Sequence, residues 1–99
     1  MFVALSRFTI ANDMVDEVRE AFRARPHLVD DEAGFLRMEV MSPLANPEEV
    51  WLLTYWTDEG SFRHWHHSHR YRHSHQGIPK GLKLVPERTE LHCLEVFAD

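Results

Sequence analysis

Four segments of the chain carry the residue pattern of a β-strand. In residues 2–10 alternate side chains fall on opposite faces, as the two-residue period of a strand requires. The run FLRMEVM, residues 35–41, alternates in the same way after Gly34. Residues 50–56, VWLLTYW, are rich in strand-forming residue types, and residues 91–98, LHCLEVFA, supply a last apolar strand. The sequence therefore predicts four strands.

Apolar residues that recur at helical intervals predict a first helix between the first two strands. They run from Val15 to Phe22, and the side-chain oxygens of Asn12 and Asp13 are expected to cap the N-terminus of this helix. Pro26 cannot donate an intrahelical hydrogen bond, so we expect the helix to end or kink there.

A second helix is predicted between the third and fourth strands. Thr57 or Asp58 can cap it, and SFRHWHHSH, residues 61–69, forms its body. Residues 69–76 are expected to add a helical turn or two after a bend. Two glycines and a proline in residues 77–81 then break the pattern.

The predicted order of elements is strand, helix, strand, strand, helix, strand. This order is typical of an α+β, ferredoxin-like βαββαβ domain, in which a four-stranded antiparallel sheet carries both helices on one face. Its length favours a single domain over residues 1–99. Every strand nevertheless has large apolar side chains on both faces, so we expect the uncovered face to pack against a second copy in a homodimer.

Composition excludes several classes of partner. With 16 acidic and 11 basic residues the net charge is −5, which does not favour nucleic acid. No apolar run reaches the ~20 residues of a membrane span, and the opening lacks the pattern of a signal peptide, so we expect a cytoplasmic protein that does not enter the membrane. The single cysteine, Cys93, fits a reducing compartment, and its apolar strand predicts a buried, unreactive thiol.

Histidine is the unusual component of this sequence. Of eight histidines, six lie within residues 64–75. His69 and His73 have the i, i+4 spacing at which two imidazoles can share a metal ion, but no nearby cysteine completes a structural zinc site. A polar helix face rich in histidine, with adventitious metal uptake, is the alternative interpretation.

Trp65 and His75 form the most informative pair of side chains. Ten residues of uninterrupted helix would separate them by ~15 Å along the helix axis. A bend near Ser68 and His69 would let both line one pocket between the helical region and the sheet. A neutral imidazole can ligate heme iron, and apolar walls suit the macrocycle. The competing interpretations are a core position for Trp65 and a solvated surface position for His75.

The whole chain resembles the antibiotic biosynthesis monooxygenase (ABM) family, small dimeric ferredoxin-like proteins that include the IsdG-like heme-degrading monooxygenases. The resemblance rests on Ser6-Arg7, Gly34-Phe35, Tyr55-Trp56, Phe62-x-x-Trp65 and His75. It implies that His75 ligates heme iron from the proximal side and that Trp65 presses on the ring and ruffles it. Ser6 stands where these enzymes have an asparagine that hydrogen-bonds bound oxygen species, and Arg25 where related members have an arginine near the heme propionates.

The resemblance thus implies O2-dependent degradation of heme, as both cofactor and substrate, with an external electron donor. Ser6 is the departure from the pattern, since its hydroxyl is a shorter donor than a carboxamide. Two alternatives stay open. One is a cofactor-independent monooxygenase of a polycyclic aromatic substrate, with Trp65, Tyr71 and imidazoles around a small-molecule pocket. The other is a non-catalytic heme-binding or metal-binding protein.

Overall fold

The computed structural model describes residues 1–68, residue 71 and residues 78–99 of the chain. The helices and strands follow in the order β1 (Phe2–Thr9), α1 (Val15–Arg23), β2 (Phe35–Met41), β3 (Glu49–Trp56), α2 (Glu59–His66) and β4 (Glu90–Glu95). Two short 3-10 helices, Leu28–Asp31 and Pro86–Arg88, lie in the connections. The predicted order of strands and helices is confirmed. The further helical turn predicted for residues 69–76 lies outside the described residues, apart from Tyr71.

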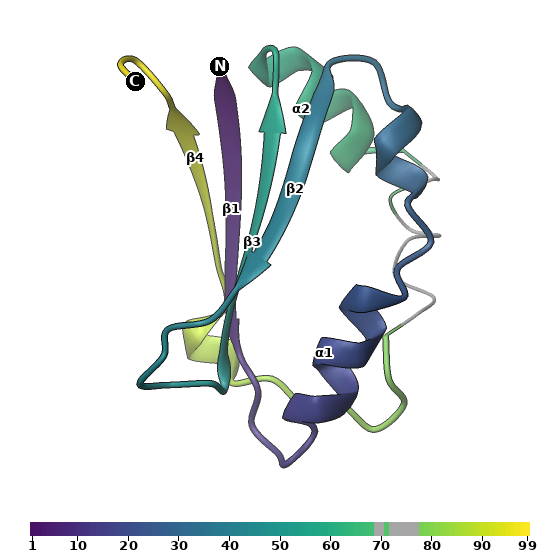
Figure 1. Ribbon diagram of the computed structural model, residues 1–99, viewed down its shortest axis with the longest axis vertical. Coiled ribbons are helices and arrows are strands. Elements are labelled where there is room, and N and C mark those ends of the chain that lie inside the picture. Colours follow the sequence, from purple (N-terminus) through teal and green to yellow (C-terminus); the bar gives the residue numbers. More distant parts are fainter. Residues whose placement is uncertain (69–70, 72–77) are drawn as a thin grey trace.

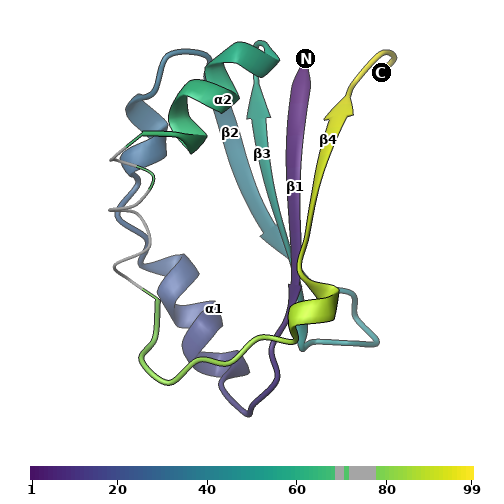
Figure 2. The same cartoon turned by 180° about the vertical axis from the view of Figure 1, so that it is seen from behind.

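The four strands form one antiparallel sheet in the order β2-β3-β1-β4. Both helices cover the same face of this sheet, α2 near the end where the chain begins and α1 near the opposite end (Figures 1 and 2). This is the ferredoxin-like α+β fold that the sequence predicts. We call the covered face the helix-facing side and the other one the open face.

Two separate apolar clusters make up the core, one beneath each helix. The cluster at α2 is built on Ala4, Val29, Trp56, Phe62 and Trp65. The cluster at α1 is built on Ile10, Val18 and Val50, with Phe8 and Phe22 packed against them. Because the helices lie one beyond the other along the strands (Figure 1), each of them buries its apolar stripe on a different part of the sheet.

The start of α2 follows the predicted pattern. Asp58 is its N-cap, and its carboxylate accepts a hydrogen bond of 2.7 Å from the backbone N–H of Ser61. The pKa of Asp58 is lower than its ordinary value, and this backbone hydrogen bond is the largest of the several influences on it. The cap fixes the first turn of the helix that carries Phe62 and Trp65.

Removing this cap is expected to loosen α2. Asp58→Ala should lower the thermal midpoint by roughly 5 °C, since an unfilled cap leaves a backbone N–H without an acceptor. Asp58→Asn keeps a side-chain oxygen at the cap and should lose much less. The measurement is thermal unfolding followed by circular dichroism, and equal midpoints for the two variants would contradict the role of the cap.

The predicted cap of α1 is wrong. The N-cap is Met14, with no side-chain hydrogen bond, and neither Asn12 nor Asp13 fills the role. The Asn12 side-chain amide instead donates to the carbonyl of Gly81, 2.9 Å away, and so ties the start of the helix to the segment that leads into β4. The last residue of α1 is Arg23, before Pro26, as expected.

Gly34 sets the approach of β2 to α2. Its φ is +83°, a backbone conformation that glycine adopts without steric cost. A Cβ at this position would also overlap the side chain of Ser61 in the first turn of α2, and the Gly34 carbonyl accepts a hydrogen bond from the backbone N–H of Thr57. Glycine therefore allows the close contact that places α2 over the sheet.

Cys93 is exposed, so the expectation of a buried thiol is wrong. The residue lies on β4, an edge strand whose six residues are all exposed in the single chain, because the helices pack over the other strands. Among the described residues, no helix is long and apolar enough to cross a membrane.

Candidate ligand site beneath the helices

The helix-facing side of the sheet has a break between its two apolar clusters. Ser6 lies in this break, between Ala4 of the α2 cluster and Phe8, which packs against the α1 cluster. The strand registers place one row of side chains across the sheet at this level, in the order Val40, Leu52, Ser6 and Leu91. We call these four residues the central row.

The central row is incompletely covered, although it lies on the helix-facing side. Leu91 is 47% exposed and Val40 is 37% exposed, and Ser6 and Leu52 are half-buried. None of the four belongs to either cluster as formed by the described residues. The row is an apolar floor with one hydroxyl near its middle, which suits a flat apolar ligand with one polar contact.

Trp65 belongs to the α2 cluster, which also contains Ala4, two residues before Ser6 on β1. Its indole is buried in the α2 cluster with Ala4 and meets the Tyr71 ring edge-on, with 5.8 Å between ring centroids. The His66 ring lies 4.7 Å from the Tyr71 ring and stacks on Phe62 at 5.2 Å. Burial raises the pKa of the Tyr71 hydroxyl, so it stays protonated at neutral pH. Trp65 therefore occupies the core position that was one of its two interpretations in the sequence.

Arg25, which precedes Pro26, was expected on the first helix. This expectation is wrong, because α1 ends at Arg23. The guanidinium of Arg25 donates to the carboxylate of Asp30 at 3.0 Å, and His27 contacts the other carboxylate oxygen at 3.2 Å. Burial alone would raise the pKa of Asp30, but the hydrogen bonds from Arg25 and His27 outweigh burial and lower it. A ligand that binds Arg25 must therefore compete with Asp30.

His75, the proposed heme ligand, lies outside the described residues, and so do His69 and His73. Within residues 1–68, 71 and 78–99, no group of three histidine, cysteine or carboxylate side chains could hold a metal ion. The structure thus brings Ser6 and Trp65 to the same side of the sheet and places Arg25 in the connection after α1.

A cavity that the sequence did not predict lies between α1 and the edge of the sheet. Its volume is about 220 Å³, and its lining is mostly apolar with two arginines, consisting of Val18, Arg19, Phe22, Arg23, Val40, Met41, Ser42 and Val50. It shares Val40 with the central row, so it adjoins the same floor. The residues of α1 that line this cavity have a pattern visible in the sequence. Arg19 and Arg23 are four residues apart, beside the apolar stripe of Val18 and Phe22.

These features define a small ferredoxin-like α+β protein with an incompletely covered apolar floor beneath its helices. The model of the antibiotic biosynthesis monooxygenase family matches residues 1–77, and the chain belongs to this family. No match is found among curated proteins.

Solved structures of the same fold carry different chemistries. The heme degrader MhuD from Mycobacterium tuberculosis, solved with two hemes in its active site, is 21% identical, with a TM-score of 0.81 over 100% of this chain and 98% of its own. SnoaB from Streptomyces nogalater, a cofactor-independent oxygenase, is 15% identical, with a TM-score of 0.76 over 99% of this chain and 94% of its own. At these identities the likeness shows the ABM fold and leaves the cofactor open.

Proposed function

We propose that this protein is a monooxygenase that binds heme between its helices and its sheet and degrades it with O2 and an external electron donor. Heme is the substrate and also supplies the redox-active iron. His75 is the proposed iron ligand, and Trp65 presses on the ring. Ser6 faces the distal side, and Arg25 is the proposed partner of a propionate.

The observation that carries this proposal is the break in the helix-facing core. A sheet covered by two helices would ordinarily be packed along its whole length, yet Ser6 and Leu52, on the two central strands, are only half-buried between the two clusters. Val40 and Leu91, on the edge strands at the ends of the row, are exposed. A large flat apolar ligand would bury this row. Two of the residues that the family resemblance selects support this placement: Ser6 lies within the break, and Trp65 belongs to the cluster at one end of it.

The described residues fit heme in two respects. First, the floor is apolar apart from Ser6, as the face of a macrocycle requires. Second, α1 and the connection after it bring three guanidinium groups to the same side of the sheet as the floor. Those of Arg19 and Arg23 line the neighbouring cavity, and that of Arg25 is bound to Asp30. A guanidinium pairs well with a carboxylate such as a propionate.

We further propose that the protein works as a homodimer in the cytoplasm. The open face carries exposed apolar side chains, among them Met41 and Leu94, and a second copy would bury them. The unpaired thiol of Cys93 fits a reducing compartment.

A cofactor-independent monooxygenase is the second candidate, and the size of the cavity favours it. At about 220 Å³ the cavity is smaller than the roughly 300–1,000 Å³ of typical ligand pockets, and it suits a smaller aromatic substrate better than heme. The serine at position 6, in place of an asparagine, also favours the cofactor-independent monooxygenase, since one short hydroxyl is a weak substitute for a carboxamide donor.

Hemin titration of the tag-free protein distinguishes the two candidates. We expect a saturable Soret band that His75→Ala weakens at least about tenfold in affinity, because it loses the iron ligand. His64→Ala, which removes an exposed histidine of α2, is the matched control and should bind hemin as the parent does.

Addition of ascorbate in air, with catalase present, then tests degradation. Bleaching of the Soret band would support the enzyme, whereas bound heme that stays intact would indicate a non-catalytic heme-binding protein. No saturable band, or one indifferent to His75→Ala, would overturn the heme proposal and favour the cofactor-independent oxygenase.

A further inference from the structure

The cavity between α1 and the edge of the sheet, which we call the α1 cavity, has a base that belongs to the core. Val18 and Val50, which are 3% and 4% exposed, form part of the α1 cluster. Phe22 packs against this cluster, with its ring 6.4 Å from that of Phe8. Since core side chains are held in place by their packing, these walls keep their shape without a ligand. The α1 cavity is therefore a preformed apolar site.

Two guanidinium groups line the same cavity. Arg19 and Arg23 are four residues apart on α1, so their side chains leave one face of the helix about 6 Å apart along its axis. The described part of the chain gives Arg19 no ion pair. Arg23 lies 3.6 Å from the carboxylate of Glu20, and these two side chains are 67% and 73% exposed, so their pair is weak. Both guanidinium groups are thus available to an anion.

The other polar features of the α1 cavity also suit an anion with an apolar body. None of the described residues that line it is acidic. Ser42 adds a hydroxyl that can donate one further hydrogen bond. An apolar base with cations and a hydroxyl beside it is the arrangement that binds an organic acid, because the base buries the body of the ligand and the cations pair with its charge.

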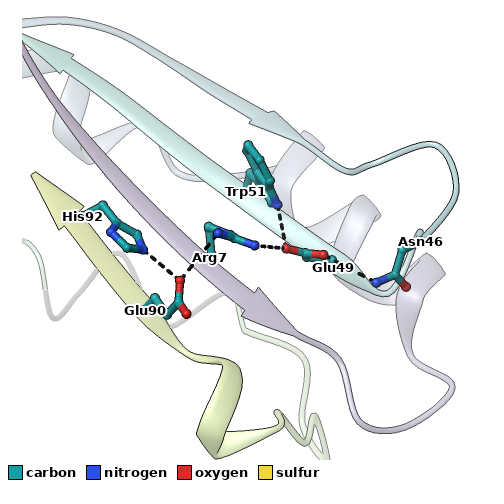
Figure 3. Close-up of polar contacts among 6 residues, drawn as sticks. All are labelled: Arg7, Asn46, Glu49, Trp51, Glu90 and His92. Atoms are coloured by element: carbon teal, nitrogen blue, oxygen red, sulfur yellow. Dashed lines mark hydrogen bonds and ion pairs between the residues drawn. The ribbon is translucent and has the colours of Figure 1, made fainter. Parts of the chain in front are cut away.

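A second cavity, of about 230 Å³ on the open face, lacks this arrangement. It is lined by Arg7, Thr9, Glu49, Arg88 and Glu90. Figure 3 shows the charged network there, in which Arg7 donates to Glu49 at 2.7 Å and lies 3.6 Å from Glu90. The Nε2 of His92 lies 2.8 Å from the same Glu90 carboxylate. Because carboxylates of the chain already line this cavity beside its arginines, it is a poor site for an anion.

We propose that the α1 cavity is a binding site for a small carboxylate with one apolar ring. The ring lies against the base of the cavity, and the carboxylate pairs with Arg19 and Arg23. A cavity of ~150 Å³ accommodates benzene. The volume of about 220 Å³ therefore leaves room for one ring and a carboxylate, but not for a macrocycle.

The position of the arginines on α1 favours a carboxylate over a phosphate ester. Arg23 is the last residue of the helix, at the end where the helix dipole is negative. A single negative charge is opposed less at this end than the ~1.5–2 charges of a phosphate ester at neutral pH. The two guanidinium groups can then outweigh the dipole.

The inference does not depend on heme being the substrate. The α1 cavity is formed by α1 and by the neighbouring ends of β2 and β3, and a ligand with one ring needs no iron and no contact with α2. Val40 belongs to both the cavity and the central row, so a bound ring lies next to the floor.

Titration of the nitrogen-15-labelled full chain with sodium benzoate, followed by two-dimensional NMR at constant ionic strength, tests this inference. The backbone amide signals of Arg19, Arg23 and Ser42 should shift together and saturate. The dissociation constant should be on the order of 1 mM, as expected for a ligand of about nine non-hydrogen atoms. No saturable shift up to ten times that concentration would overturn the inference.

Two further ligands separate the contributions of charge and ring. Benzamide has the same ring without the charge, and acetate has the charge without the ring. Each should bind at least about fivefold more weakly than benzoate, since each loses one of the two contacts. Benzamide binding as tightly as benzoate would exclude the role of the arginines, and acetate binding as tightly would exclude that of the apolar base.

Arg19→Gln tests the assigned contact directly. It should weaken benzoate binding roughly fivefold, the effect of one exposed ion pair. Arg19 is exposed, so the variant should fold as the parent does, which the same spectra check. Arg63→Gln, which removes an exposed arginine of α2, is the matched control and should bind benzoate as the parent does. Equal affinities for Arg19→Gln and Arg63→Gln would overturn the assignment.

His75→Ala distinguishes this site from the proposed heme site. The variant should lose affinity for hemin and keep its affinity for benzoate. Loss of both ligands would indicate a single shared site and would overturn the inference. A parent chain that binds benzoate in this way but no hemin would leave the inference standing while the proposed heme degradation fails.

Discussion

Replacement of Trp56 by alanine is expected to destabilise the protein by about 3–5 kcal/mol, as truncation of a buried aromatic side chain does. Trp56 is fully buried, at 0% exposure, in the cluster beneath α2. Its ring meets Phe35 at 5.4 Å and Phe62 at 5.9 Å, both edge-on, and its Nε1–H donates to the hydroxyl of Thr54 at 2.9 Å. Alanine would leave a large cavity in the cluster and remove the hydrogen bond to the half-buried Thr54 hydroxyl.

This loss is a large part of the roughly 5–15 kcal/mol that holds a typical domain together. Urea unfolding followed by circular dichroism measures it. Trp56→Phe keeps most of the apolar volume and should cost far less than alanine. Trp51→Ala, on the open face, is the control for loss of an indole outside the helix-facing core. A Trp56→Ala variant as stable as Trp51→Ala would show that the cluster is not the main source of stability.

The sequence predicted the fold well because the fold depends on local patterns. Alternation in β1 assigned Ala4 and Ser6 to one face and Arg7 to the other, and the strand registers confirm this division. Thr57 and Asp58 were the predicted candidates for the cap of α2, and Asp58 fills this role, since a cap depends on residues within one helical turn.

Features that depend on tertiary contacts were not predictable in this way. Asn12 has the side chain of a cap, but the carbonyl of Gly81, 69 residues away, is its actual partner. Arg25 was expected on a helix and is instead bound to Asp30 in the connection after it. Cys93 was expected to be buried, but β4 lies at an edge of the sheet that the helices do not cover.

The candidate site was predicted only as far as separate residues could indicate it. Trp65 and Ser6 were selected from the sequence, whereas the break between the two clusters needs the strand register that aligns Ser6 with Leu52 and Leu91. The network of Arg7, Glu49 and His92 was missed for the same reason, because its members come from three strands that are far apart in sequence.

The central row also indicates which change should affect activity most. Ser6 is its one polar residue, and the structure gives its hydroxyl no hydrogen bond within the described part of the chain that would hold it away from a ligand. A carboxamide reaches about 1.5 Å further than a hydroxyl, by one more carbon–carbon bond. If the short reach of this donor limits turnover, a longer donor at the same position will increase it.

Ser6→Asn is therefore expected to speed heme degradation by roughly tenfold to a hundredfold, since one well-placed hydrogen-bond donor is worth about that much or more in catalysis. The measurement is the rate of Soret bleaching under ascorbate and air, with hemin affinity determined in parallel. Ala45→Asn, which adds the same side chain in the exposed turn between β2 and β3, is the matched control and should leave the rate unchanged. Equal hemin affinity and an equal rate for Ser6→Asn and the parent would show that the donor at this position does not limit the reaction. That result would move the search for the limiting step to the supply of electrons, because the variant changes neither of the other two proposed heme contacts, Trp65 and His75.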